Sequence, residues 1–512
     1  MTINYRDYTF LGATQSLCPE CLTLVPAKIV ERHGRIYFRK RCPKHGPRED
    51  FVCSDVRWFD RTGYSLPGKV PSAFGVEPER GCPYDCGLCI EHEQHTCIGL
   101  LEITSSCNLE CPMCFAVSGP GGEHLSADDC RRAIDRLVEV EGQPEILQLS
   151  GGEPTIHPDF LDVFEYACAQ PIDIVMINTN GIRLARDRDL IERLAEYRHR
   201  AEIYLQFDGF DEHGSEVLRG ESLVETKLRA IEVLGEAGLR TTLVATLQPG
   251  VNDHEMGQIV QFGSGRPWIT GVSFQPATYT GRYVRPDQLE RRVTFPDVIR
   301  GVAEQTNGDW LEADFSPLPC AHPNAHTLAY AYRSGNQLVP LARFIDLENH
   351  LDLLSGRITF NRQRARQLIG EYLARQPCGL GGCNDGMELE RDRAARQGNA
   401  RRGAFPLAPG GDVATENLGD EFFKRALTED LAPEDVFRIT TTSFMDAYNF
   451  DVRQLMKSCV HQVLPTGHLV PFSAYNVLYR DGHVPLPPLQ QRALGSEVSL
   501  QESTTAQMSP TP

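Results

Sequence analysis

Three cysteines, Cys107, Cys111 and Cys114, stand in the segment "CNLECPMC" with the spacing C-x3-C-x2-C. Three thiolates at this spacing can hold three irons of a [4Fe–4S] cluster, which normally takes four protein thiolates. No fourth cysteine follows nearby, so one iron would stay open to a small molecule that offers an amino and a carboxylate group. The triplet is therefore predicted to be catalytic rather than structural.

Polar and glycine residues follow the apolar segments downstream of this triplet. Consecutive glycines let a backbone approach a bound molecule closely, and the carboxylate after them could meet its ammonium group. Side chains at the ends of the later segments could meet ribose hydroxyls. The expected cofactor-binding residues are Gly151, Gly152, Glu153, Asn180, Gln206, Asp208 and Gln275.

An earlier segment, "GCPYDCGLCIEHEQHTC", repeats the same spacing with Cys82, Cys86 and Cys89. Cys97 follows, so four thiolates are available, and four thiolates would close every iron of a cluster. We interpret this group as an auxiliary [4Fe–4S] site, with zinc as the alternative because four thiolates also suit zinc. The two histidines of this loop, His92 and His95, are expected to be solvated or to hydrogen-bond to the metal ligands without binding the metal themselves.

The N-terminal cysteines form two short knuckles, "CPEC" and "CPKHG". Cys18, Cys21 and Cys42 are the expected ligands of one tetrahedral metal, zinc or iron. The fourth ligand is either His45, which has knuckle spacing, or Cys53, which would make an all-sulfur site like that of rubredoxin.

Four more cysteines, Cys320, Cys378, Cys383 and Cys459, are scattered over the C-terminal part. We expect a second auxiliary cluster here rather than free thiols, because reactive unpaired cysteines are a liability. The two remaining cysteines, Cys130 and Cys168, share helical faces with apolar residues and are expected to pack in the core.

Alternating strand and helix patterns over residues 99–310 must position these groups. Six near-continuous apolar runs, each followed by an amphipathic segment, predict six βα units in a parallel sheet curved into a partial barrel. Ligands of such sheets bind at the carboxyl ends of the strands. The expected units are 1–60, a mononuclear metal module; 61–98, an auxiliary cluster segment; 99–310, the α/β partial barrel; 311–488, a mixed auxiliary-cluster domain; and 489–512, a disordered tail.

The composition narrows the class of protein. The chain of 512 residues carries a net charge of −18, which argues against nucleic acid as a partner. Its 17 cysteines, without a recognisable signal peptide, indicate metal binding and a cytoplasmic location rather than disulfides. No apolar run is long enough to span a membrane.

The triplet, the "GGE" segment and the "TNG" segment, in this order, resemble the radical S-adenosylmethionine (SAM) superfamily. The segments "CPEC", "SFQPATYTGR", "PLPCAHP" and "PFSAYN" extend the resemblance over roughly residues 8–480, to the archaeal tetraether lipid synthase group. Relatives of that group are assigned as methyltransferases of 7,8-dihydro-6-hydroxymethylpterin. Two positions depart from these patterns: Met113 stands where an aromatic residue is common, and Ser473 where a cysteine is common.

The resemblance implies reductive cleavage of SAM to a 5′-deoxyadenosyl radical that functionalises an unactivated carbon. The main expectation is C–C bond formation between lipid alkyl chains, which calls for a long apolar channel and transient membrane association. Methylation of a small molecule such as a dihydropterin calls instead for a compact polar pocket, and peptide modification is a further alternative. The implied cofactors and partners are SAM, its [4Fe–4S] cluster, one or two auxiliary [4Fe–4S] clusters, a mononuclear iron or zinc, and a low-potential donor such as ferredoxin or flavodoxin.

Overall fold

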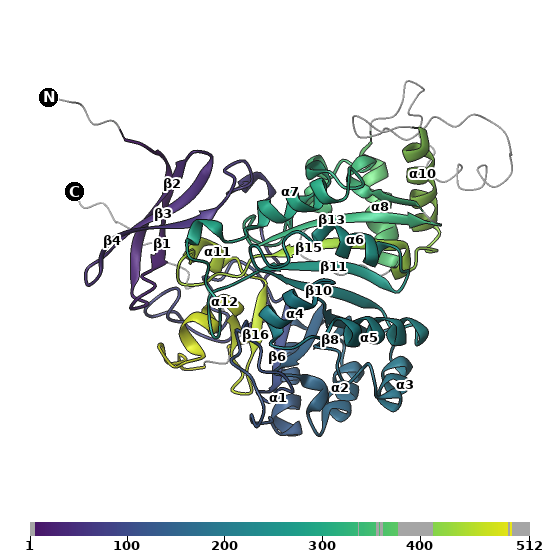
Figure 1. The fold of residues 1–512 in the computed structure, drawn as a ribbon, viewed down its shortest axis with the longest axis horizontal. Coiled ribbons are helices and arrows are strands. Elements are labelled where there is room, and N and C mark those ends of the chain that lie inside the picture. Colours follow the sequence, from purple (N-terminus) through teal and green to yellow (C-terminus); the bar gives the residue numbers. More distant parts are fainter. Residues whose placement is uncertain are drawn as a thin grey trace, which may run out of the picture.

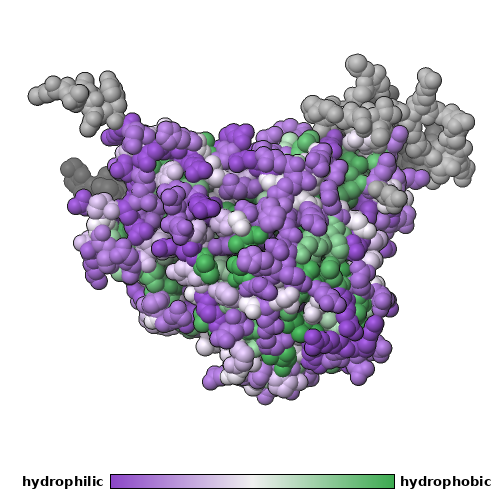
Figure 2. Space-filling model, in the orientation of Figure 1, coloured by the Kyte–Doolittle hydropathy of each residue, from purple (hydrophilic) through white to green (hydrophobic). Residues whose placement is uncertain are grey.

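A computed structural model describes residues 6–335, 337–354, 358, 362–376, 413–489 and 492–493. Two sheets dominate it, a small N-terminal one and a large central one that the helices cover (Figure 1). On the face shown in Figure 2, hydrophilic residues predominate and hydrophobic ones gather in separate areas. Among the described residues, no helix combines the length and apolar character that crossing a bilayer requires.

Six parallel strands form the middle of the large sheet, as the apolar runs predict. They are β6 (Ile98–Thr104), β7 (Ile146–Gly151), β8 (Ile174–Thr179), β9 (Ala201–Gln206), β10 (Thr241–Leu247) and β11 (Ile269–Pro276). The six expected helices are α1 (Ala127–Glu141), α2 (Phe160–Ala169), α3 (Arg188–Glu196), α5 (Val224–Glu236), α6 (Met256–Ser264) and α7 (Phe295–Gln305). The α/β fold predicted from the sequence is confirmed.

Helix α1 shows how local sequence sets an element. Ser126 caps it, since its Oγ accepts a hydrogen bond of 3.1 Å from the Asp129 amide. Gly142 ends it with a φ of +71°. Cys130 and Cys168 are buried, on α1 and α2, within the apolar core, which agrees with their expected packing role. One short helix, α4 (Glu212–Arg219), has no counterpart among the expected elements.

Strands from the C-terminal part extend the same sheet at both edges. β15 (Val436–Thr442) pairs in parallel with β11, and β16 (Val460–Val463) pairs in parallel with β6. The outer strands are β12 (Ser316–Pro317), β13 (His326–Ser334) and β14 (Gln337–Pro340) beyond β15, and β17 (Leu469–Pro471) beyond β16. The C-terminal strands thus continue the core sheet. The sequence of this region, with its mixture of helical and loop patterns, does not indicate this pairing.

The remaining C-terminal helices pack around these strands. α8 (Arg362–Arg375), which the sequence predicts, and α10 (Val413–Leu427) share an apolar cluster beside β13. α11 (Val452–Met456), α12 (Phe472–Ala474) and a π-helical turn (Tyr475–Tyr479) lie near the other edge. Short 3-10 turns occur at Thr62–Tyr64, Pro154–Ile156, Leu289–Arg291, Glu312–Asp314, Leu341–Arg343, Glu348–Leu354 and Pro433–Asp435.

The N-terminal segment is more regular than its cysteine-rich sequence indicates. β1 (Thr9–Leu17), β2 (Leu24–Arg32), β3 (Arg35–Cys42) and β4 (Gly46–Cys53) form an antiparallel meander. In β3 buried and more exposed side chains alternate, a period-two pattern that its many arginines obscure. A small pairing of β5 (Ala73–Phe74) with β18 (Arg492–Ala493) places two residues of the expected tail in a sheet.

Two expected ligands, Cys378 and Cys383, lie outside the described residues. The same holds for the expected tail 489–512, apart from residues 489, 492 and 493.

Candidate active site and metal centres

The second cysteine triplet lies in the loop that follows β6, at the carboxyl edge of the sheet. The loop is held from two sides: the Cys107 amide donates to Gly119 O at 2.9 Å, and Cys114 and Arg282 exchange two backbone hydrogen bonds of 2.9 Å. Cys107, Cys111 and Cys114 all line one cavity. This is the position where parallel sheets of this kind place their ligands.

The walls of that cavity come from nearly every strand end of the sheet. Five of the seven expected cofactor-binding residues line it: Gly151, Gly152, Asn180, Gln206 and Gln275. The other two, Glu153 and Asp208, are buried behind the wall. Further lining residues include Met113, Phe115, Asn178, Tyr204, Arg219, Thr278, Arg282, Phe444, Met445, Phe472, Ser473 and Asn476.

Glu153 is 1% exposed and binds protein donors instead of facing the cavity. Its Oε1 accepts from the amide and hydroxyl of Thr155 at 3.1 and 2.6 Å and from the Thr179 hydroxyl at 2.7 Å. Its Oε2 accepts from the Asn180 amide at 2.7 Å. Burial raises the pKa of Glu153, and these four hydrogen bonds oppose that rise. Glu153 therefore ties the loops after β7 and β8 together, and its expected contact with an ammonium group stays a prediction.

The packing of the backbone also requires glycine at positions 151 and 152. Gly151 has a φ of +128°, and a Cβ there would collide with the carbonyl oxygen of Thr104. A Cβ on Gly152 would collide with the carbonyl oxygen of Ser106. Both glycines thus let the loop after β7 pack against the start of the cysteine loop, while still lining the cavity.

Asp208 holds an arginine in the cavity wall. Its carboxylate accepts from Arg219 Nε at 2.7 Å and Nη2 at 2.6 Å, and both side chains are about 95% buried. The Gln206 side-chain oxygen, turned toward the guanidinium, accepts from Arg219 Nη1 at 2.8 Å. Gln206 and Asp208 therefore position Arg219, whose guanidinium faces the cavity, and the expected ribose contacts of the pair stay a prediction.

Lys227 is a second buried cation beside the triplet. Its ammonium donates to the backbone oxygens of Gln206 at 2.7 Å and Asn180 at 3.2 Å. Burial lowers its pKa to about 8. Burial also raises the pKa of the Cys111 thiol, while the nearby charges of Arg219 and Lys227 oppose that rise. These cations favour thiolates and anionic ligands at this end of the cavity.

The sequence analysis missed both cations. Lys227 could have been found, because Leu223, Ala230 and Leu234 share its helical face and all are buried. A lysine on an apolar face signals either a long side chain reaching water or a functional cation. Arg219 ends the unexpected helix α4, and no pattern in the sequence marks it.

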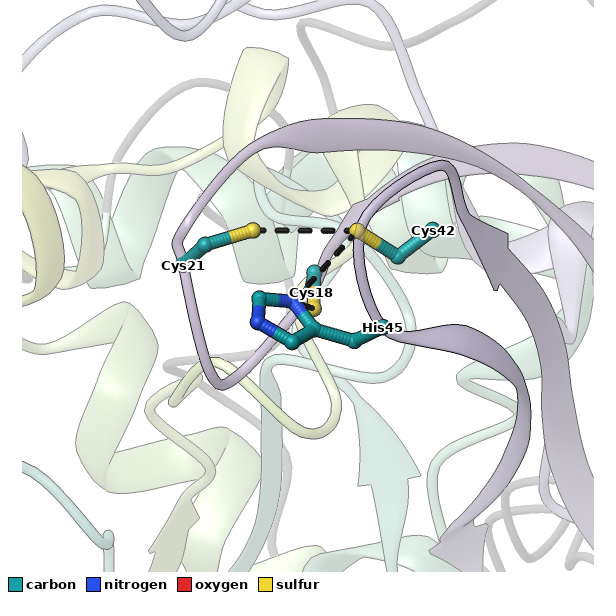
Figure 3. A group of neighbouring side chains, drawn as sticks. All are labelled: Cys18, Cys21, Cys42 and His45. Carbon is teal, nitrogen blue, oxygen red and sulfur yellow. Dashed lines mark hydrogen bonds between the residues drawn. The ribbon is translucent and has the colours of Figure 1, made fainter.

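The N-terminal knuckles converge on one site, at the end of the meander (Figure 3). Cys21 Sγ lies 3.7 Å from Cys42 Sγ, and His45 Nδ1 lies 3.5 Å from Cys18 Sγ and 3.6 Å from Cys42 Sγ. Cys53 points elsewhere: it is buried in the main core, and its thiol faces the Asp55 carbonyl oxygen at 3.5 Å. Of the two alternatives for the fourth ligand, the geometry favours His45, because Cys53 ends β4 on its core-facing side.

Comparison with known proteins agrees with this architecture. Residues 101–263 match the radical SAM superfamily, and residues 10–54 match the HMPTM N-terminal zinc ribbon domain. A 7,8-dihydro-6-hydroxymethylpterin dimethyltransferase of Methanocaldococcus jannaschii is 32% identical over 496 residues, covering 91% of this chain and 94% of the relative. The chain belongs to the radical SAM superfamily. It is a radical SAM enzyme with a zinc ribbon at its N-terminal end.

Other relatives match a smaller part of this radical SAM enzyme. Mycofactocin maturase MftC of Mycobacterium ulcerans is 31% identical over 166 residues, covering 32% of this chain and 42% of the relative. The crystal structure of Streptococcus suis SuiB superposes with a TM-score of 0.34 at 19% identity, covering 42% of this chain and 46% of SuiB.

The residues present fit the radical SAM cofactors. Three cysteines face a cavity with buried cations at one end and amide side chains along its walls, which suits a three-thiolate cluster and the amino acid and nucleoside parts of SAM. Met113 replaces the common aromatic residue, lines the cavity and accepts a hydrogen bond on Sδ from the Val284 amide at 3.0 Å. The position of Ser473 also belongs to this cavity, where its hydroxyl accepts from the Met445 amide at 3.0 Å.

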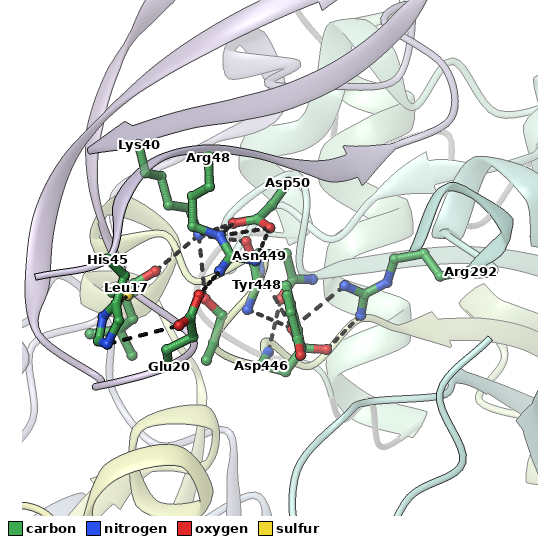
Figure 4. A network of polar contacts seen from close by, with 12 residues as sticks. Leu17, Glu20, Lys40, His45, Arg48, Asp50, Arg292, Asp446, Tyr448 and Asn449 are labelled. Atoms are coloured by element: carbon green, nitrogen blue, oxygen red, sulfur yellow. Dashed lines mark hydrogen bonds and ion pairs between the residues drawn. The ribbon is translucent and has the colours of Figure 1, made fainter. Parts of the chain in front are cut away.

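Polar contacts anchor the zinc ribbon of this radical SAM enzyme to the loop that holds Asp446, Tyr448 and Asn449 (Figure 4). Lys40 is 3% exposed; its ammonium pairs with Asp50 at 3.1 Å and donates to Tyr448 O at 2.7 Å and Ala447 O at 3.3 Å. Asp446, on the same loop, pairs with Arg292 at 2.7 Å. Met445 on this loop lines the cavity, so the ribbon contacts and stabilises one wall of the cavity.

The first triplet and Cys97 do not form one group. Cys82, Cys86 and Cys89 line a separate small cavity. Cys97 Sγ lies instead 3.9 Å from Cys320 Sγ, in an apolar cluster that also holds Cys459. The expected grouping is corrected here because Cys97 directly precedes β6 and is carried with that strand into the sheet. Of the two histidines expected to be solvated or supporting, His95 is buried and His92 is partly buried, and burial lowers the pKa of His92 to about 4.

Proposed function

We propose that this radical SAM enzyme methylates a small dihydropterin, with 7,8-dihydro-6-hydroxymethylpterin as the first substrate to test. The observation that carries the proposal is the similarity to a 7,8-dihydro-6-hydroxymethylpterin dimethyltransferase, which extends over 91% of this chain. A match of that length extends well beyond residues 101–263, the part that matches the superfamily model. The proposal therefore concerns the whole enzyme and not only its catalytic core.

The chemistry of the cavity supports a compact polar substrate. Asn178 and Gln275 line it, and a carboxamide side chain carries both donors and an acceptor. Asn476 also lines the cavity, but its amide is held by Phe472 O and Arg480 Nε. The Gln275 side chain donates to the Tyr204 hydroxyl at 3.1 Å, which orients its oxygen. A pterin ring carries alternating donors and acceptors along its edge, and paired amides suit such an edge.

Aromatic rings close the opposite side of the cavity. Phe472 packs against Phe444 at 4.1 Å and against Phe115 at 5.0 Å between ring centroids. Flat aromatic faces of this kind pack on a planar ring and keep water away from it. Lipid coupling would call for a long apolar channel, whereas this cavity is lined by amides, hydroxyls, Arg219 and Arg282 as well as by apolar groups. We therefore place methylation of a pterin ahead of the coupling of lipid chains.

Several residues would hold the cofactors. Cys107, Cys111 and Cys114 would hold the cluster, and when bound the cluster would supply the electron that cleaves SAM. Arg219, fixed by Asp208, is placed to bind an anionic group at the cluster end of the cavity. Cys82, Cys86 and Cys89 would hold an auxiliary cluster, and their separate cavity supports a role apart from substrate binding.

The test is product analysis after anaerobic reconstitution. The enzyme is incubated with SAM, a low-potential reductant and 7,8-dihydro-6-hydroxymethylpterin, and mass spectrometry follows methylated pterin and 5′-deoxyadenosine. We expect pterin that has gained methyl groups, and none with the variant in which Cys107, Cys111 and Cys114 are alanine. A parallel incubation with archaeal lipid extract is the competing arm. Coupled alkyl chains there, with unmodified pterin in the first arm, would overturn the proposal.

A further inference from the structure

A second group of buried sulfur and nitrogen atoms lies at the edge of the sheet, away from the ribbon. Cys97 directly precedes β6 and Cys459 directly precedes β16, and these strands run parallel as neighbours. The amides of Cys97 and Ile98 both donate to Cys459 O, at 2.9 and 3.1 Å. The turn after β12 brings Cys320 to the same place. Three distant segments of the chain therefore deliver their thiols to one point.

The two distances from Cys97 Sγ match those around a single metal ion. Two thiolates bound to one tetrahedral metal at about 2.3 Å lie about 3.8 Å apart, and a thiolate and an imidazole nitrogen lie about 3.6 Å apart. Cys97 Sγ lies 3.9 Å from Cys320 Sγ and 3.6 Å from His95 Nε2. Cys459 lies with Cys97 and Cys320 in one buried apolar cluster. Thiolates of a [4Fe–4S] cluster each bind a different iron and so stand farther apart.

The ligand distances of the zinc ribbon can be compared with those of this second group. There the corresponding sulfur–sulfur distance is 3.7 Å and the nitrogen–sulfur distances are 3.5 and 3.6 Å. The two sites thus have nearly the same spacing. They differ in burial, because His95, Cys97, Cys320 and Cys459 are each at most 1% exposed.

His95 is oriented as metal-binding histidines are. Its Nδ1 donates to Glu141 Oε2 at 3.0 Å, which leaves Nε2 3.6 Å from Cys97 Sγ and 3.8 Å from Glu145 Oε1. The other oxygen of Glu141 accepts from the Thr96 amide at 2.8 Å, so the carboxylate itself is fixed. A carboxylate that holds the far nitrogen of a histidine is the usual support behind a metal ligand.

We propose that Cys97, Cys320, Cys459 and His95 form a second mononuclear site for one thiophilic divalent metal, zinc or ferrous iron. The site is closed, as structural metal sites are. It joins the start of β6, the start of β16 and the turn after β12, and so fastens the C-terminal strands to the catalytic core. The proposal is independent of the substrate.

Metal analysis of the full-length protein tests this site. In a Cys21→Ser background, which removes the ribbon metal, we expect one remaining metal ion that is not part of a sulfide-containing cluster. Adding Cys459→Ser or His95→Ala should remove that ion and leave acid-labile sulfide unchanged. Cys168→Ser, which alters a buried cysteine of the core, should leave both quantities unchanged.

X-ray absorption of the Cys21→Ser protein gives a second measurement that does not depend on the folding of further variants. For zinc we expect three sulfur neighbours at about 2.3 Å and one nitrogen at about 2.0 Å. Loss of sulfide together with several irons in Cys459→Ser would show that these thiols hold a cluster instead. Unchanged metal content, with no such neighbours around any metal, would show four buried side chains that bind none.

Discussion

Replacing Asp208 with asparagine should weaken both the stability of the enzyme and its binding of SAM. Asp208 accepts two hydrogen bonds from Arg219 at 2.7 and 2.6 Å and a third from the Thr246 amide at 3.0 Å. An asparagine keeps one acceptor oxygen and turns an NH2 group toward a guanidinium N–H. Both residues are buried, and removing one partner of a buried ion pair costs about 3–5 kcal/mol. That is a large share of the stability of a typical domain.

Two assays separate the effects of Asp208→Asn. Chemical denaturation followed by circular dichroism reports stability, and anaerobic calorimetry reports the affinity for SAM. Glu236→Gln is the matched control, since it breaks the exposed pair Arg188–Glu236 and should change stability by less than about 1 kcal/mol. The double variant Asp208→Leu with Arg219→Met should recover much of the stability without recovering SAM binding, because a buried apolar pair needs no charge compensation. If Asp208→Asn behaves like the control in both assays, Arg219 does not depend on this carboxylate.

Three further predictions concern other parts of the molecule. Cys21→Ser should remove one metal ion from the full chain, whereas Cys53→Ser should leave metal content unchanged; loss of metal in the latter would move the fourth ligand to Cys53. Lys40→Met should speed amide hydrogen exchange over residues 445–449, since it removes the ammonium that binds this loop, while the exposed Lys28→Met should not; equal exchange in both would refute the anchoring role. Because burial lowers the pKa of Lys227 to about 8, the unfolded state binds more protons than the folded one from there up to the ordinary lysine pKa. Between pH 8 and about 10.5, the free energy of unfolding of the enzyme should therefore rise by roughly 3 kcal/mol relative to that of Lys227→Met. Chemical denaturation at several pH values measures both free energies, and a difference that does not change with pH would contradict the lowered pKa.

The catalytic core is the part of the fold that sequence patterns predict well. Each of its six strands is a short apolar run, and each expected helix has its own periodic face or cap, as at Ser126 in α1. These features are local, so they can be read without knowing the fold. The cysteine triplet is local too, since its three ligands lie within one loop after β6.

Non-local features are where the predictions were incomplete or wrong. Cys97 stands eight residues after Cys89 in the sequence, yet its sulfur lies against Cys320 because β6 carries it away from that loop. Glu153 and Asp208 were expected to bind the cofactor directly; in the fold their carboxylates accept hydrogen bonds from neighbouring side chains and backbone, and their contacts with the cofactor stay a prediction. A carboxylate after a strand predicts a polar contact, but the partner depends on which other strand ends lie beside it.

The sequence by itself thus determined the core α/β units, the triplet that would hold the catalytic cluster and three of the ligands of the N-terminal metal. Only the tertiary structure decided that β15 and β16 extend the same sheet, that Arg219 and Lys227 bring positive charge to the triplet, and that His45 rather than Cys53 lies beside the three ribbon cysteines. The physical reason is the distance along the chain over which each kind of interaction acts. Periodicity and ligand spacing act within one turn or one strand, whereas sheet edges and buried charges are matched by segments that meet only after the chain has folded.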